Sequence, residues 1–131
     1  ISDGGLGAKE LIKEMQSLAT NPSLAELVTD RQLRCFSGSI NDLEKTVSII
    51  LKNSENKELI GKIAFDTLMM AGTITSSWQM LLSLERASNA LKDNTSTAEF
   101  FSEKTETVKH FLDFILPRYL SNFATITAIT E

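Results

Sequence analysis

A chain of 131 residues is long enough to bury a hydrophobic core without disulfides or metal, and we expect one domain over residues 1–131. The composition is 42% hydrophobic and 23% charged, with two prolines and six glycines, which excludes a long disordered tail or linker. The net charge is −4 and the basic residues are scattered, which argues against a nucleic-acid partner.

The ends and the single cysteine favour a piece of a larger cytoplasmic protein. Cys35 is the only cysteine, which rules out an internal disulfide and suits a reducing compartment. The chain begins at Ile1 with no initiator methionine or signal pattern, as an excised fragment would. The most apolar stretch, Ile63 to Leu84, contains Asp66 and Gln79, so we expect a buried helix and no membrane span.

The first predicted helix runs from Leu6 to Ala19, after a turn over Ser2 to Gly5. Its apolar side chains recur at spacings of four and three: Leu11, Met15 and Leu18. Such spacing places them on one face of an amphipathic helix.

A second bundle helix is predicted from about Leu33 to Asn53. Pro22 suits the first turn of a helix, and residues 24–31 fit either an early turn of this helix or a separate short one. The apolar residues that follow Leu33 are spaced by 3, 4, 3, 4 and 3: Phe36, Ile40, Leu43, Val47 and Ile50. This spacing is typical of the seam along which bundle helices pack.

The third helix is the longest and the most apolar. We expect its buried face to carry nine residues: Ile60, Ala64, Leu68, Ala71, Ile74, Trp78, Leu81, Leu84 and Leu91. Further apolar side chains lie on its other faces, which predicts that it is covered on more than one side. Small residues from Ala71 to Thr73 predict that a neighbouring backbone comes close there.

The last helix follows a polar turn at 93–96, where Thr97 and Glu99 suit a helix N-terminus. Its apolar residues are Phe101, Val108, Leu112, Ile115, Tyr119, Phe123, Ile126 and Ile129. Pro117 removes one backbone hydrogen bond and predicts a kink. With short connections, the sequence predicts an all-α, up-down antiparallel four-helix bundle whose last helix is kinked at Pro117.

No residue stands out as catalytic, cofactor-binding or metal-binding. His110 is the only histidine; a phosphotransfer role is one alternative, but a plain helix-face position near Glu106 is favoured. Asp66 and Glu85 could act as a buried base, although a place at the bundle edge or beside a basic residue is favoured. Cys35 fits a half-buried small apolar residue better than a reactive thiolate.

Two other features are weighed as sites. The run Gly4-Gly5-Leu6-Gly7 has some likeness to a phosphate-binding loop, but it lacks the strand and the lysine, so a turn is favoured. Trp78, together with Met69, Met70 and Met80, fits either a ligand groove or core packing, and core packing is the more frequent use.

Two stretches resemble a known family. Residues 63–72, 78–81 and 85–87 resemble the long central helix of the acetyl-CoA dehydrogenase C-terminal-like domain. Residues 100–104, 108–112 and 115–118 are similar to the last helix of that domain. The likeness extends from about Gly5 to Ala128.

This resemblance implies a C-terminal part of a bacterial FAD-dependent acyl-CoA dehydrogenase, which oxidises an acyl-CoA to its 2,3-enoyl form. The flavin and the catalytic residues would belong to other parts of the parent enzyme, so no catalytic residue or cofactor is expected in this chain. The implied partners are the catalytic domains of the parent and a second subunit.

The implied packing surface is apolar. We expect it at side chains beyond the needs of one seam: Met69, Met70, Trp78, Phe100 and Phe123. The alternative is a free-standing helical interaction module that docks an unrelated helix through the same surface.

Overall fold

The computed structural model describes residues 5–131, apart from the side chain of Leu6. All regular elements within these residues are helical, and they contain no strand. In chain order they are α1 (Leu6–Ala19), α2 (Pro22–Ala25), α3 (Asp30–Lys52), α4 (Lys57–Lys92), α5 (Ala98–Phe114), the 3₁₀ turn η1 (Leu116–Arg118) and α6 (Tyr119–Thr130). The predicted all-α class is confirmed, and residues 24–31 divide between the short helix α2, a turn and the first residues of α3.

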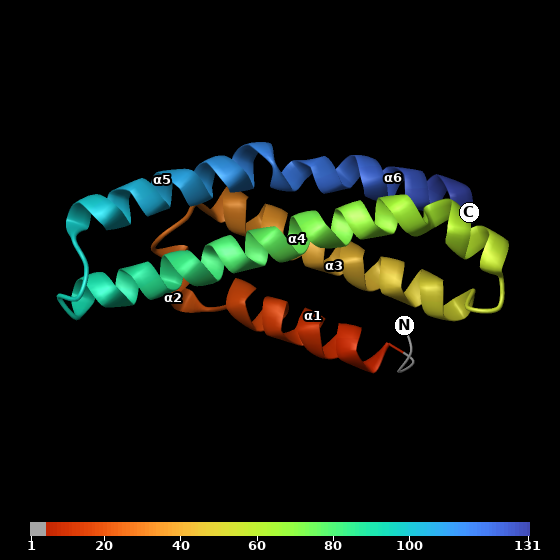
Figure 1. Ribbon diagram of the computed structural model, residues 1–131, viewed down its shortest axis with the longest axis horizontal. Coiled ribbons are helices and arrows are strands. Elements are labelled where there is room, and N and C mark those ends of the chain that lie inside the picture. The colour runs from red at the N-terminus through yellow and green to blue at the C-terminus, as the bar shows by residue number, and fades with distance from the viewer. Residues whose placement is uncertain (1–4) are drawn as a thin grey trace.

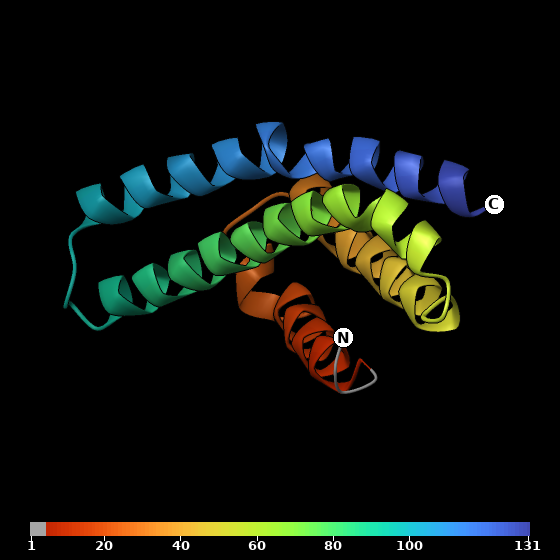
Figure 2. The same cartoon turned by 45° about the vertical axis from the view of Figure 1, so that its right-hand side comes forward.

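The four long units run alternately up and down (Figure 1). Helices α3 and α4 lie in the middle, with α1 on one side and the α5–α6 unit on the other (Figure 2). Helix α4 packs against both α5 and α6, whereas α1 packs mainly against α3. The result is the predicted antiparallel bundle, with α3 and α4 shared between its two sides.

Side-chain caps fix where most helices begin. At α3, Thr29 Oγ1 accepts from the Gln32 backbone N–H at 3.1 Å, and Gln32 Oε1 accepts from the Thr29 N–H at 2.9 Å. Asn56 caps α4, and Thr97 caps α5 as the sequence predicts. Each cap satisfies a backbone N–H that has no partner within its helix.

Gly5 is the N-cap of α1, with a φ of 88°. A side chain there would be strained by this backbone conformation. Its Cβ would also come within 2.9 Å of the Leu51 side chain of α3. Gly5 therefore serves the start of α1, Leu6 and Gly7 are helical, and Gly4 lies outside the described residues.

The seam of α3 is buried as predicted. Phe36, Ile40, Leu43 and Val47 are among the buried core residues, and Ile50 is half-buried. On α1, Met15 and Leu18 are buried, while Leu11 is half-buried. Amphipathic spacing identified these faces because each helix has one clear polar side.

The predicted buried face of α4 is wrong in its first half. Ala64 and Leu68 are exposed, and the buried positions there are Ile63 and Met70. Met70 points toward α3, where the Thr46 hydroxyl lies 3.7 Å from its sulfur. Contacts with α3 and α6 set the rotation of α4, which an all-round apolar pattern could not reveal.

Pro117 interrupts the last helix as predicted. It lies in η1, between α5 and α6, which continue along α4 in roughly the same direction (Figure 2). Leu116 and Tyr119 are buried at this bend. The Tyr119 hydroxyl donates to Asp42 Oδ2 of α3 at 2.8 Å, so the bend is anchored to the centre of the bundle.

Candidate functional site

The two carboxylates considered as bases each join two helices. Glu85 Oε2 accepts from Asn21 Nδ2 at 2.7 Å and from the Ser23 hydroxyl at 3.2 Å, which ties α4 to the start of α2. Asp66 Oδ1 accepts from Asn122 Nδ2 at 3.0 Å, which ties α4 to α6. Amide and hydroxyl donors bind these oxygens, and both residues are half-buried, which fits the bundle-edge alternative and not the one beside a basic residue. Both contacts hold neighbouring helices together, and neither leaves the carboxylate free of a hydrogen-bond donor.

His110 and Cys35 lie in ordinary helical settings. His110 is exposed on α5, with its ring centroid 4.8 Å from that of Phe114. Burial raises the pKa of the half-buried Cys35 thiol, and the charge of Arg31 offsets only part of this rise. A raised pKa leaves the sulfur mainly as the thiol, which is a weak nucleophile. No group of three metal-binding side chains is found among the described residues.

Asp113 joins α5 to the beginning of α3. Its Oδ1 accepts from Arg31 at 2.8 Å and from the Gln32 side chain at 3.2 Å. Burial by itself would raise the pKa of Asp113, but these hydrogen bonds and the Arg31 charge outweigh it and lower the pKa below 3.8. This network therefore joins α5 to α3, and through Gln32 it also contacts the N-terminal cap of α3.

The most distinctive surface feature is an apolar stripe on the first half of α4. Phe65 is 69% exposed, Leu68 is 72% exposed and Met69 is 47% exposed. Gly72 and Ser76 continue the stripe at helical spacing, and both are exposed. We call Phe65, Leu68, Met69, Gly72 and Ser76, with the adjoining Phe111 of α5 and Ile115 just after α5, the outer face.

The outer face is hollowed where α4 meets α5. One hollow of about 270 Å³ contacts Leu68, Met69, Phe111 and Ile115. A second, of about 470 Å³, continues past Gly72 and Ser76 to Met80. A Cβ built on Gly72 would meet nothing within 4 Å, so no backbone of the described residues comes close to Gly72 itself. The two hollows share Gly72, Ser76 and Phe111, and the polar residues Thr73, Thr75, Ser76 and Gln79 line them beside the apolar ones.

Of the residues singled out from the sequence, Met69 alone lies on the outer face. Met70 is fully buried, which agrees with the core-packing alternative and excludes it from an exposed packing surface. Trp78 is half-buried against the core, Phe100 is 52% exposed near the start of α5, and Phe123 lies on α6 in a different groove. Phe65 was not singled out and Leu68 was assigned to the buried face, although their spacing with Met69 and Gly72 could have indicated a second stripe.

The described residues form an all-helical bundle in which several polar side chains join the helices. Three of its exposed large apolar side chains lie on the outer face, and the others, Phe100, Phe114, Leu120 and Ile129, lie on α5 and α6. The family described as acetyl-CoA dehydrogenase C-terminal like matches residues 11–131. The chain therefore belongs to this family, and the resemblance seen in the sequence is confirmed.

Comparison with curated proteins and with solved structures gives no match. None of the helices in residues 5–131 is both long enough and apolar enough to cross a bilayer.

Proposed function

We propose that residues 1–131 are the C-terminal helical domain of a cytoplasmic FAD-dependent acyl-CoA dehydrogenase, and that the domain itself is not catalytic. Family membership supports the type of parent enzyme. The acid–base candidates Asp66 and Glu85 are both engaged in helix contacts. We therefore assign proton abstraction and hydride transfer to flavin to other parts of the parent.

The role of the domain is to pack through its outer face against the catalytic body or a partner subunit. The observation that carries this proposal is the exposure of Phe65 and Leu68, at 69% and 72%, on a helix whose opposite side is buried in the core. Contiguous exposed apolar patches on soluble proteins commonly mark interaction sites. The gap beside Gly72 gives room for a partner backbone or side chain.

The test is to express the longest open reading frame that includes this chain, with and without residues 1–131. We expect the longer protein to bind flavin and oxidise acyl-CoA. We also expect loss of the domain to change its subunit number or its acyl chain-length preference. Unchanged assembly and preference would contradict the packing role. A reading frame that starts just before Ile1 would instead favour the free-standing interaction module.

A sharper variant separates docking from folding. Leu68→Asp adds a negative charge to the outer face, and Asn89→Asp adds the same charge to an exposed position on the other half of α4. Because burying an unpaired carboxylate is costly, Leu68→Asp should weaken assembly while Asn89→Asp leaves it intact. Equal assembly of both variants, measured by light scattering, would count against the outer face as the interface.

A further inference from the structure

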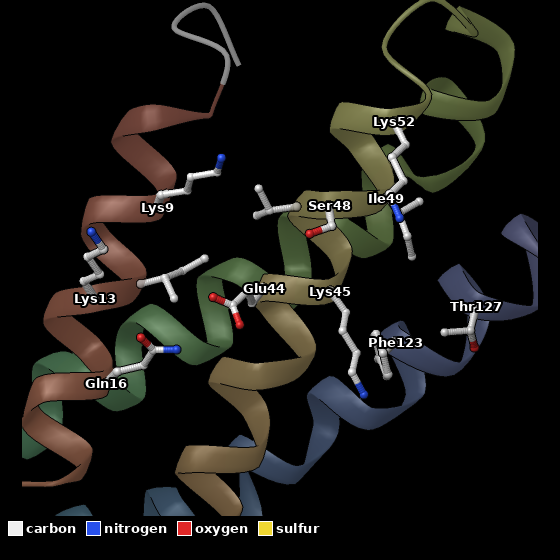
Figure 3. Close-up of a pocket in the computed structure, with 12 residues that line it drawn as sticks. Lys9, Lys13, Gln16, Glu44, Lys45, Ser48, Ile49, Lys52, Phe123 and Thr127 are labelled. Carbon is white, nitrogen blue, oxygen red and sulfur yellow. The ribbon is translucent and has the colours of Figure 1, made fainter.

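A third surface hollow, of about 650 Å³, lies between α1, α3 and α6 (Figure 3). Lysines line it on two helices: Lys9 and Lys13 on α1, and Lys45 and Lys52 on α3. Phe123 of α6 closes its other side. We call this hollow the lysine groove.

The charge of the lysine groove is opposite to that of the chain. Four ammonium groups and one carboxylate, that of Glu44, line it, whereas the whole chain has a net charge of −4. The ion pairs within residues 5–131 are Arg31–Asp113 and Lys62–Glu58, so no described carboxylate forms an ion pair with any of the four lysines. A concave surface lined mainly by one sign of charge concentrates ions of the other sign.

The groove also offers apolar surface. Ile12 and Val47 form part of its wall, and the half-buried Ile49 and Phe123 contribute further area. Its volume falls within the range of about 300 to 1,000 Å³ that is typical of small-molecule sites. A partner helix would need an apolar stripe, but the lining of α3 includes Glu44, Lys45 and Ser48. The mixed chemistry therefore favours a small anionic ligand over a helix.

The lysines are spread along the groove. Lys45 and Lys52 are seven residues apart on α3, which is about 10 Å along a helix axis. Figure 3 shows the Lys9 side chain extending into the space between α1 and α3, and the Lys45 amino group near Phe123. One phosphate could not contact all of these groups, whereas a ligand with several phosphates could.

We propose that the lysine groove binds a phosphate-bearing organic anion of nucleotide size, with its ring or apolar part against Phe123 and Ile49. Both coenzyme A and ADP have this chemistry. The choice of coenzyme A as a probe rests on the proposed function. The proposal of an anion site rests instead on the charge and shape of the groove. Binding at the groove and assembly through the outer face are thus separate properties of the chain.

The test is calorimetric titration of the 131-residue chain with coenzyme A, with ADP and with pyrophosphate. We expect saturable binding of coenzyme A that weakens as salt is added, since salt screens exposed charges. Lys9→Gln combined with Lys45→Gln should weaken binding about tenfold or more, because charge-assisted contacts are lost. The matched control combines Lys92→Gln with Lys104→Gln, which removes the same charge outside the groove.

The three probes distinguish the source of the phosphates. Binding of ADP as well as coenzyme A would assign recognition to the shared adenosine diphosphate. Binding of coenzyme A alone would require its additional phosphate or its pantetheine arm, and both results support the groove as a site.

Several results would overturn the proposal. These are no binding at millimolar coenzyme A, equal weakening in the control variant, or pyrophosphate binding as tightly as coenzyme A, which would leave the apolar part without a role. Self-association that is lost in Lys9→Gln/Lys45→Gln, without binding of any probe, would assign the groove to a second copy of the chain. None of these results would alter the assembly test of the outer face.

Discussion

Two apolar stripes run along α4, and only one of them is covered by the chain. Met70, Ile74, Leu81 and Leu84 of the inner stripe are fully buried. The other stripe, which belongs to the outer face, also consists of large apolar side chains, yet Leu68 is 72% exposed. The hydrophobicity of a residue therefore does not determine its burial here. Folding of the bundle accounts for the inner stripe, and the outer stripe is left for a partner.

The largest expected effect is on the inner stripe. Leu81→Ala removes a fully buried side chain from the core and leaves a cavity. We predict that it lowers the free energy of unfolding by about 2 to 5 kcal/mol. Urea denaturation followed by circular dichroism measures this change. A loss below about 1 kcal/mol would mean that the inner stripe is not the core of the bundle.

Tyr119→Phe should lower the free energy of unfolding by an amount between those of the Leu81 and Leu68 substitutions. The ring remains packed, but the hydrogen bond from the hydroxyl to Asp42 is lost. We predict a loss of about 1 kcal/mol. In the unmodified 131-residue chain, burial and this hydrogen bond raise the pKa of Tyr119. A spectroscopic titration should therefore show that its single tyrosine ionises at a higher pH than a free phenol does. An ordinary tyrosine titration would contradict the contact.

Asp113→Asn should have a smaller effect that depends on pH. The pKa of Asp113 is lower in the folded chain than its usual 3.8, so the carboxylate stabilises the fold above that value. This contribution is lost as the pH falls through the lower, folded pKa. Because Arg31 is 67% exposed, we expect a loss of no more than about 1 kcal/mol at neutral pH. Unfolding measured across the acid range should show a weaker pH dependence in the variant than in the parent chain.

Leu68→Ala should have the smallest effect on folding. It is the same chemical change as Leu81→Ala on the same helix, but it removes a side chain that is mostly in water. We predict a change within about 0.5 kcal/mol in the isolated chain. A loss as large as that of Leu81→Ala would show that Leu68 is packed within the bundle, and the comparison of the two stripes would fail.

The sequence predicts the helices better than it predicts their faces. Pro22 and Thr97 mark helix starts through their local chemistry, and Pro117 ends a helix for the same reason. The seam of α3 is readable because its other side is polar. On α4, apolar residues occur all round, so its rotation depends on contacts such as Asp66 with Asn122 that join distant segments.

The candidate site could be predicted only in part for the same reason. Met69 and Met70 are adjacent and chemically identical, yet one is 47% exposed and the other fully buried. A rotation of 100° per residue separates them, and the sequence contains no signal that selects one. The lysine groove was not anticipated, because its cations come from two helices whose pairing only the fold establishes.

The most direct test of the outer face is the reactivity of a thiol placed on it. Leu68→Cys, combined with Cys35→Ser, would be labelled with a thiol reagent in two proteins: the isolated 131-residue chain and the product of the longest open reading frame that includes it. Asn89→Cys, also combined with Cys35→Ser, is the control. We predict fast labelling of both variants in the isolated chain and strong protection of the Leu68→Cys thiol alone in the parent protein. Equally fast labelling of that thiol in both proteins would contradict docking through the outer face.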